Sequence, residues 1–218
     1  MSFNPQTHYQ NKNIATNYDR ERFASLAGQT FQRAELKCLE QIVQRLPSRG
    51  TLLDVPCGTG RIAEVLVNWG FQVTAADISG EMIDVARQRI ANAGGYLPAL
   101  RASADGLPFP NESFDAVISM RFLPHISDES RRLMLREMAR VSKRWVIFSN
   151  SFSSSWYRGR RLVKRYLGHQ APTRYPVTED DLMEDLRFAD LTEITRLWTF
   201  RFVSEEILVL CEKNSQGS

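Results

Sequence analysis

The chain has 218 residues, of which 43% are apolar and 24% charged, a composition that suits one globular domain with a short appendage. No apolar stretch reaches the roughly 18 to 20 residues that cross a bilayer, and the polar first twenty residues offer no secretory signal, so we expect a soluble, cytoplasmic protein. The net charge of +3 does not by itself indicate nucleic-acid binding. The three cysteines form no C-x-x-C pair, so neither a metal site nor a disulfide framework is expected.

Residues 1–48 are predicted to form an N-terminal arm and a helical cap. Residues 1 to about 17 are rich in Asn, Gln and Thr and lack apolar patterning, which is typical of a loosely docked arm. Helical periodicity then indicates two helices, at Tyr18 to about Leu26 and at Phe31–Leu46. Pro47 ends the second helix before the first strand.

The segment Thr51–Gly60 predicts a buried strand, a tight loop and the start of a helix. A short apolar run is followed by Asp54 and then by two glycines, after which apolar residues recur at helical spacing. In an open α/β sheet, ligands bind at such a junction because backbone N–H groups converge beyond the strand. Gly58 and Gly60 would let the main chain approach a ligand closely. The Asp54 carboxylate favours a ligand that carries an ammonium group or hydroxyls.

The residues from Leu53 to Gly60 (Leu-Asp-Val-Pro-Cys-Gly-Thr-Gly) resemble a known family motif. It is the first motif, D/E-x-G-x-G-x-G, of the class I S-adenosylmethionine-dependent methyltransferases. Pro56 occupies the place of the first glycine and fixes φ near −65° there. The resemblance covers roughly residues 50–212. It implies an α/β, Rossmann-like three-layer sandwich, with a seven-stranded, mostly parallel sheet that ends in a C-terminal antiparallel hairpin.

A second acid is predicted at the end of the second strand. This strand is expected at Phe71–Ala76, with Asp77 after it and a helix over Ser79–Ile90. Asp77 lies 23 residues after Asp54, close to the spacing of about 20 at which an acid accepts hydrogen bonds from ribose hydroxyls. Asp77 would alternatively cap the following helix, and the two roles can coexist.

A short third strand, near Leu97–Ala102, leads into a segment that is similar to a further motif of the family. That motif is D-A-E-x-L-P-F-x-x-x-S-F-D, in which an acid and the next backbone N–H bind the adenine. Ser103 stands where the acid is expected, so Ser103 and Asp105 are alternative acceptors for the adenine amine. The backbone of Ala104 is the favoured contact.

The fourth strand is expected at Ala116–Met120, and its carboxyl end opens on the same side as the first two acids if the sheet is parallel. The Met120 carbonyl would take the ammonium of the methionine part. His125 is a candidate base toward an acceptor hydroxyl, although a lone histidine after a proline is more often structural. Arg121 either binds an acidic acceptor or is a surface charge.

A helix at Asp128–Val141 and a strand at Arg144–Ser149 precede an insert over residues 150–176, in which five of the eight residues from 158 to 165 are basic. In similar enzymes such an insert belongs to the acceptor site, and its candidate substrate-binding residues are Trp156, Tyr157 and Arg160. A solvated helix face, an anionic membrane surface and a nucleic acid are the alternatives. We favour an acidic or amphiphilic small acceptor over RNA or DNA.

The last predicted elements are a helix at Thr178–Arg187 and two strands, Leu191–Phe200 and Glu205–Glu212. The few residues between these strands permit only an antiparallel hairpin. The whole chain is therefore expected to be one methyltransferase domain, 1–218, with its core at 50–212.

The resemblance implies methyl transfer from S-adenosylmethionine to O, N or C of a small-molecule, saccharide or lipid-linked acceptor. It assigns the cofactor to Asp54, Pro56, Gly58, Gly60, Asp77, Ile78, Met82, Ala104, Asp105 and Met120. One alternative is an NAD(P)-binding oxidoreductase, because residues 58–63 also fit the dinucleotide pattern G-x-G-x-x-A. Asp54, which would repel a pyrophosphate, argues against it. A non-catalytic, cofactor-binding regulatory subunit is the other alternative.

Overall fold

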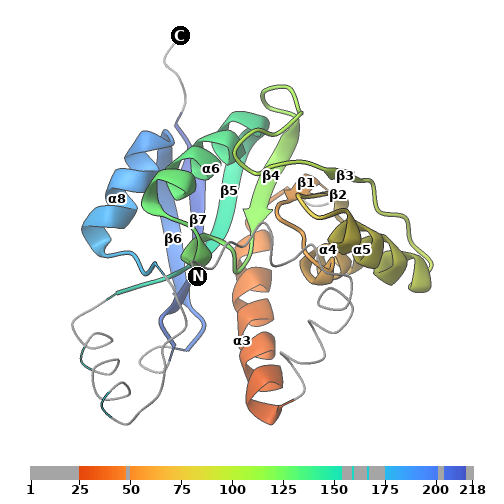
Figure 1. The fold of residues 1–218 in the computed structure, drawn as a ribbon, viewed down its shortest axis with the longest axis horizontal. Coiled ribbons are helices and arrows are strands. Elements are labelled where there is room, and N and C mark those ends of the chain that lie inside the picture. The colour runs from red at the N-terminus through yellow and green to blue at the C-terminus, as the bar shows by residue number, and fades with distance from the viewer. Residues whose placement is uncertain are drawn as a thin grey trace.

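The structure is a computed structural model that describes residues 25–47, 50–153, 159, 166, 175–200 and 204–214. One sheet of seven strands organises the fold (Figure 1), in the order β3-β2-β1-β4-β5-β7-β6. Neighbouring strands are parallel except at β7, which pairs antiparallel with both β5 and β6. The strands are β1 (Thr51–Asp54), β2 (Gln72–Asp77), β3 (Ala99–Arg101), β4 (Phe114–Ser119), β5 (Ser142–Ser151), β6 (Leu191–Trp198) and β7 (Glu206–Lys213). The predicted fold class is confirmed.

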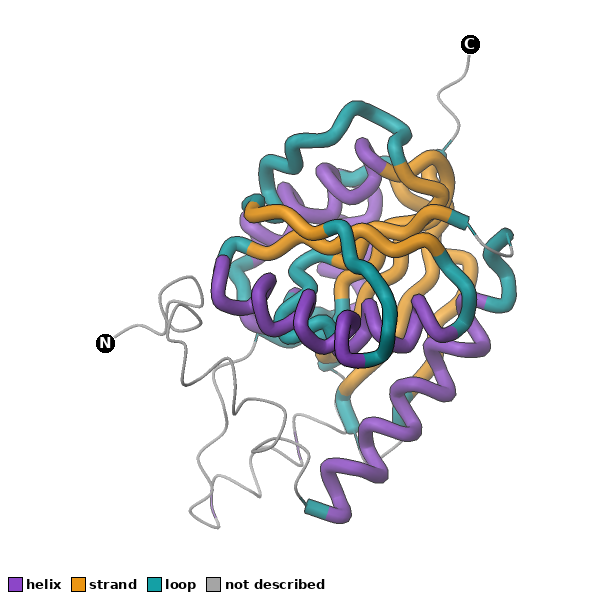
Figure 2. Tube along the Cα trace, turned by 90° about the vertical axis from the view of Figure 1, so that its right-hand side faces the viewer, coloured by secondary structure: helices purple, strands orange, loops and turns teal. Residues whose placement is uncertain are grey.

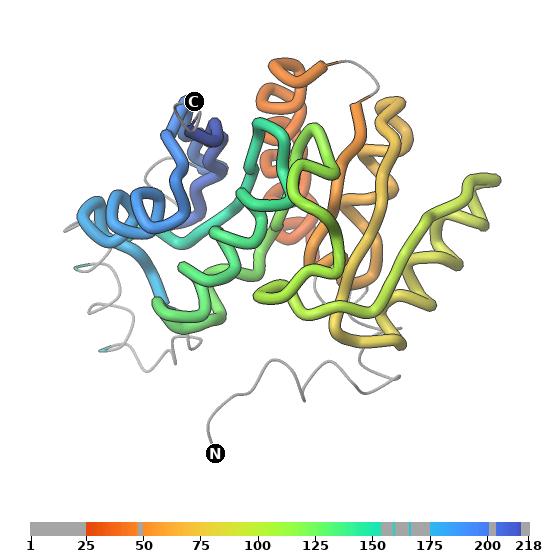
Figure 3. Tube along the Cα trace, turned by 90° about the horizontal axis from the view of Figure 1, so that it is seen from above, coloured from red at the N-terminus to blue at the C-terminus, as the bar shows by residue number. Residues whose placement is uncertain are grey.

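Helices cover both faces of the sheet. They are α3 (Leu26–Val43), α4 (Arg61–Asn68), α5 (Gly80–Asn92), α6 (Asp128–Val141), α8 (Glu179–Phe188) and the short 3₁₀ helix η1 (Leu123–His125). One apolar cluster joins α3, α4 and α5 to one face, and the other joins α6 and α8 to the opposite face. Figure 3 shows α3 and α6 on opposite sides of the strands. Because both faces are covered, the middle residues of the central strands β1, β4 and β5 are apolar and buried, as expected of a buried parallel sheet.

Side-chain caps set several helix starts. The hydroxyls of Ser79, Ser127 and Thr178 accept hydrogen bonds from backbone N–H groups in the first turns of α5, α6 and α8. Thr178 and Asp181 form a reciprocal capping box. Such caps stabilise a helix by about 1 kcal/mol, and they explain why the predicted boundaries of α6 match the observed ones.

The start of the first described helix differs from the prediction. We expected a helix from Phe31, but α3 begins at Leu26, where the Ser25 hydroxyl accepts from Gly28 N at 3.0 Å. Most of the predicted helix at Tyr18–Leu26 lies outside the described residues. Figure 2 shows α3 extending past the edge of the sheet.

The strand lengths also differ, because pairing rather than local pattern sets them. β3 is short and pairs only with β2. β5 is longer than predicted and pairs with β7 from Trp145 to Ser151. Asn150 and Ser151 therefore belong to the strand and not to the predicted insert, most of which lies outside the described residues.

Candidate functional site

The carboxyl ends of β1 and β2 lie side by side at the same end of the sheet. β1 is flanked by β2 on one side and by β4 on the other, so the strand order reverses direction here. Such a switch point is where ligands bind in open α/β sheets. Asp54 is the last residue of β1, and only 1% of its surface is exposed. The loop beyond it is tied to β2, because Cys57 N donates to Ala76 O at 2.9 Å.

Asp77 joins the two strand ends. Its Oδ2 accepts a hydrogen bond from Gly58 N at 2.8 Å, and its Oδ1 accepts one from Ser79 N at 2.9 Å. The cap of α5 is the Ser79 hydroxyl, which accepts from Met82 N at 3.2 Å, so Asp77 fixes the glycine loop rather than capping the helix. Each carboxylate oxygen has more than one lone pair, which leaves Asp77 able to accept from a ligand as well.

The two glycines of the loop have different roles. Both have left-handed backbones, with φ of 51° at Gly58 and 74° at Gly60. A Cβ on Gly60 would lie 2.7 Å from the Cβ of Ala86, so the absence of a side chain here permits close packing against α5. A Cβ on Gly58 would meet nothing within 4 Å. Open space therefore lies beside Gly58, and both glycines remain candidates for contact with the cofactor.

Burial changes the charge expected at the site. It raises the pKa of Asp54 to about 7, although Arg61 and the Ala63 N–H oppose it, and Asp77 adds to the rise. Burial also raises the pKa of Asp77, although the hydrogen bonds from the N–H groups of Ser79 and Gly58 act to lower it. The sequence suggested a full negative charge on Asp54, whereas near neutral pH this acid is only partly ionised. A cationic ligand would favour its ionised form.

The loop after β3 is held by α6. The Ser103 hydroxyl donates to Asp105 Oδ1, so these two alternative adenine acceptors contact each other. Ala104 is half-buried and packs against the core. Further along the loop, Glu137 Oε2 accepts from Leu107 N at 3.0 Å, and Arg140 donates to the Leu107 and Phe109 carbonyls at 2.9 Å.

The end of β4 carries the remaining predicted residues. Met120 is buried, and Arg121 follows it with a φ of 59°. Arg121 Nε donates to Glu35 Oε1 at 2.5 Å and its side chain is only 10% exposed, so the surface-charge alternative is wrong. His125 is half-buried at the end of η1, and Ile78 is half-buried beside the buried Met82. Trp156, Tyr157 and Arg160 lie outside the described residues.

Glu35 borders the candidate site, and the sequence analysis did not name it. Its carboxylate is 1% exposed and also accepts from Arg61 Nη2 at 2.9 Å. It falls on the apolar side of α3, in helical register with Phe31 and Leu39, and an acid in an apolar stripe was the available signal. Its partners Arg61 and Arg121 lie 26 and 86 residues away along the chain, and no local sequence pattern indicated these two contacts.

Among the described residues, no group of His, Cys, Asp and Glu could hold a metal ion, and no helix is both long and apolar enough to cross a membrane. Residues 52–144 match the family described as "Methyltransferase domain". This match covers less than half of the 218 residues. The match spans β1 to the start of β5, and it therefore includes both buried acids and the loop between them.

The curated relatives of this chain are matched over only part of their own length. An uncharacterized methyltransferase, YodH, from Bacillus subtilis is 38% identical over 92 residues, or 42% of this chain and 38% of the relative. A ubiquinone biosynthesis O-methyltransferase from Sinorhizobium medicae is 35% identical over 85 residues, which cover 38% of this chain and 34% of that one. The ubiquinone/menaquinone biosynthesis C-methyltransferase UbiE of Pseudomonas fluorescens is 31% identical over 160 residues, 64% of this chain and 60% of the relative. The chain thus spans about one third to three fifths of these relatives.

A solved structure confirms the fold over nearly the whole chain. Magnesium protoporphyrin IX methyltransferase (ChlM) from Synechocystis PCC 6803, crystallised with SAH, has a TM-score of 0.74 and 18% identity. The match covers 97% of this chain and 100% of that one. At this identity the likeness concerns the fold alone.

Proposed function

We propose that this domain binds S-adenosylmethionine across the carboxyl ends of β1 and β2 and transfers its methyl group to a small-molecule acceptor. The observation that carries the proposal is the pair of buried acids, Asp54 and Asp77, joined by the Gly58 loop at the switch point of the sheet. The family match over the same residues supports it.

Each acid suits one part of the cofactor. The Asp54 carboxylate, buried and beside the loop, would pair with the ammonium of the methionine part together with the Met120 carbonyl. Asp77 would accept from the ribose hydroxyls while it holds Gly58 N. The adenine would lie against Ile78 and Met82, with the Ala104 backbone at its edge and Asp105 held close by Ser103.

When bound, the cofactor would supply a methyl group on a cationic sulfur, and the C–S bond would break as the acceptor's electron pair bonds to the methyl carbon, which leaves the sulfur as a neutral thioether. The protein aligns the reactants and excludes water, and this alignment alone supplies a large part of such a barrier reduction. For a hydroxyl acceptor, His125 is the candidate base that would take the proton.

The acceptor class rests on the relatives. Two of them are named for O- and C-methyl transfer in ubiquinone biosynthesis, which supports methylation of oxygen or carbon on a small molecule. A saccharide or a lipid-linked intermediate fits the same chemistry. We place this activity in the cytoplasm.

Calorimetry with purified protein tests the cofactor, and micromolar binding of S-adenosylmethionine is expected. Incubation with methyl-labelled cofactor and fractionated cell extract then tests transfer, because label should appear in a small-molecule fraction. Binding without transfer to any fraction would favour a non-catalytic subunit. The absence of binding would overturn the proposal.

A further inference from the structure

Buried polar groups without a hydrogen-bond partner lie at the carboxyl ends of the neighbouring strands β4 and β5. Ser119 is the last residue of β4, and Asn150 and Ser151 are the last two residues of β5. The Oγ atoms of both serines and Nδ2 of Asn150 are buried and have no hydrogen-bond partner. At most 1% of each residue is exposed. In the strand order these groups follow β1 on the side away from β2, so they lie next to the proposed cofactor site.

The side-chain amide of Asn150 is oriented with its donor free. Its Oδ1 accepts a hydrogen bond from Ser151 N at 2.8 Å. Only the oxygen of a carboxamide can accept from this N–H, so the contact fixes the orientation and leaves both hydrogens on Nδ2 without an acceptor. Proteins pair nearly all buried donors with protein, ordered water or a ligand, because an unpaired donor costs stability. Asn150 Nδ2 is therefore a donor that a bound molecule would satisfy.

Asn150 and Ser119 lie on the same face of the sheet. Ser119 is opposite Phe148 in the β4–β5 register, and Asn150 follows Phe148 by two residues, so all three side chains point to one side. Phe148 belongs to the apolar cluster that also contains Leu123 of η1. The same short helix ends at His125, the candidate base. The free donor and the free hydroxyl therefore lie on the face against which η1 packs.

The charged groups that the structure describes near the end of β4 are balanced. Glu35 accepts from Arg61 Nη2 at 2.9 Å and from Arg121 Nε at 2.5 Å. A second carboxylate, Glu206 Oε1, lies 3.8 Å from Arg121 Nε. Two arginines therefore face two carboxylates, and Arg121, which follows β4, is already paired.

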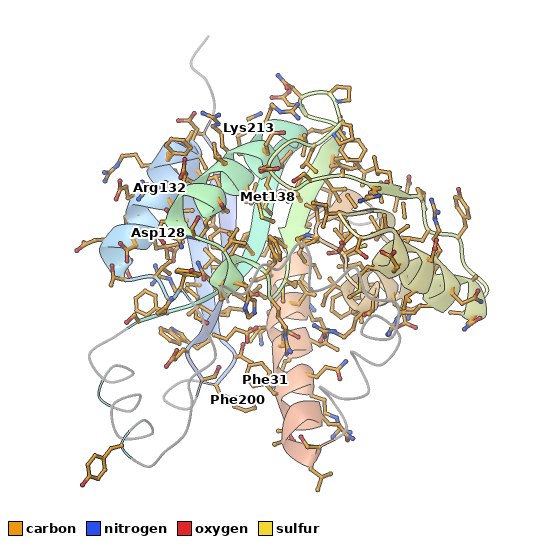
Figure 4. All side chains as sticks on the ribbon, viewed as in Figure 1. Phe31, Asp128, Arg132, Met138, Phe200 and Lys213 are labelled. Carbon is orange, nitrogen blue, oxygen red and sulfur yellow. The ribbon has the colours of Figure 1, made fainter. Side chains whose placement is uncertain are left out.

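Aromatic rings adjoin the same arginine. The Arg121 guanidinium lies 5.0 Å from the ring centroid of Phe31. The rings of Phe31 and Phe200 are 6.0 Å apart, and Figure 4 shows the two labels together between α3 and the β6–β7 hairpin. Arg121 is therefore held between acids and rings, and it is not the counter-ion that an acidic acceptor would need.

We propose that Asn150 and Ser119 form part of the acceptor site, in which Asn150 Nδ2 donates a hydrogen bond to an oxygen of a neutral acceptor. This inference rests on the proposed function, since it places the acceptor beside the strand ends that hold the cofactor. A carbonyl, hydroxyl or ether oxygen suits an uncharged amide donor. Burying an anion without a counter-ion costs far more than burying a neutral oxygen. An acidic acceptor, held by the basic insert outside the described residues, is the alternative.

The first experiment tests the charge of the acceptor. A protein-free cell extract is passed over anion- and cation-exchange resins in series at neutral pH. The flow-through and the salt eluates are then incubated separately with the wild type and methyl-labelled S-adenosylmethionine. Label should appear in a compound of the flow-through. Label confined to an eluate would leave the proposed function standing and overturn this inference. If no fraction takes up label, the proposed function fails, and the inference fails with it.

The second experiment tests the two residues, with the flow-through as the probe. Asn150→Leu removes the donor and Ser119→Ala removes the hydroxyl. Each should raise the KM for the flow-through by about fivefold or more, because one hydrogen bond to the acceptor is lost. The Kd of S-adenosylmethionine, measured by calorimetry, should change by less than about twofold. An Asn150→Leu variant with the KM of the wild type would overturn the inference.

Ser142→Ala is the matched control at the opposite end of β5. Ser142 is also buried, but its hydroxyl donates to Trp145 O at 2.9 Å. Its removal should leave the KM unchanged and lower the midpoint of thermal unfolding by about 2–4 °C. Ser119→Ala removes a hydroxyl that has no partner, so its midpoint should not fall. If Asn150→Leu does not fold, Ser119→Ala decides: a lower midpoint with an unchanged KM would mean a structural role and overturn the inference.

Discussion

The Gly58 N–H donates a hydrogen bond to Asp77 Oδ2 at 2.8 Å, so the acid at the end of β2 fixes the loop that follows β1. The same carboxylate holds Ser79 N at the start of α5. Three segments therefore share one buried carboxyl group, and a change at Asp77 must affect the shape of the loop as well as any direct contact with a ligand.

Replacement of Asp77 by alanine should weaken S-adenosylmethionine binding at least tenfold, which corresponds to about 1.4 kcal/mol or more. The variant loses both the acceptor for the ribose hydroxyls and the group that orders the Gly58 N–H. Calorimetry on the folded variant measures the effect. Unchanged affinity would remove Asp77 from the site.

Asp54 should make the stability of the ligand-free protein fall as the pH rises. Its folded pKa of about 7 exceeds the unfolded value of about 3.9, so the native state binds more protons between these values. This contribution is present in full below about pH 4 and is lost as the pH rises through 7. The free energy of unfolding of Asp54→Asn, relative to that of the wild type, should therefore rise by about 2–4 kcal/mol from pH 4 to pH 8. Denaturant unfolding at several pH values measures it.

Asp115 serves as a control, because its contribution to stability should depend on pH in the opposite direction. The Thr51 N–H, helped by Lys143, lowers the pKa of Asp115 to about 2. Its contribution is therefore present above the unfolded value of about 3.9 and is lost as the pH falls toward 2. Asp115→Asn should be less stable than the wild type at neutral pH, and the difference should shrink in acid. Parallel trends in the two variants would contradict one of the two assignments, and the direction of the shared trend would show which.

The two loop glycines should differ when each is changed to alanine. Gly60→Ala combines a left-handed backbone with a 2.7 Å approach to the Cβ of Ala86, and should cost at least about 2 kcal/mol of stability. In Gly58→Ala the new methyl group meets no atom within 4 Å, so the loss of stability should be about 1 kcal/mol. The same methyl group should weaken cofactor binding. Thermal unfolding and calorimetry on both variants separate the effects, and equal stability losses would argue against the packing role of Gly60.

Arg140 should support the loop that follows β3. It donates to the carbonyls of Leu107 and Phe109, and Arg140→Gln frees both. We expect roughly five- to tenfold weaker S-adenosylmethionine binding, or about 1–1.4 kcal/mol, because the adenine would then meet a less ordered loop. Arg136→Gln, on the same helix but over the Phe188 ring, is the matched control and should bind normally. Equal binding by the two variants would show that the loop needs no such support.

The amino-acid sequence determined those features that depend on neighbouring residues. The strand–loop–helix segment at Thr51–Gly60, the α6 boundaries and the C-terminal hairpin follow from apolar periodicity, caps and short connections. The G-x-G-x-x-A pattern alone left two enzyme classes open. The observed strand order, with β7 inserted antiparallel between β5 and β6, agrees with the methyltransferase alternative.

Only the tertiary structure decided the surroundings of each candidate site residue. It placed Gly60 against Ala86, buried Asp54 so that its pKa rises to about 7, and brought Glu35 to Arg61 and Arg121. These properties depend on burial and on charges that lie tens of residues away along the chain. Local sequence patterns carry no information on either, because a carboxylate's solvation and its partners are fixed only when separate elements pack together.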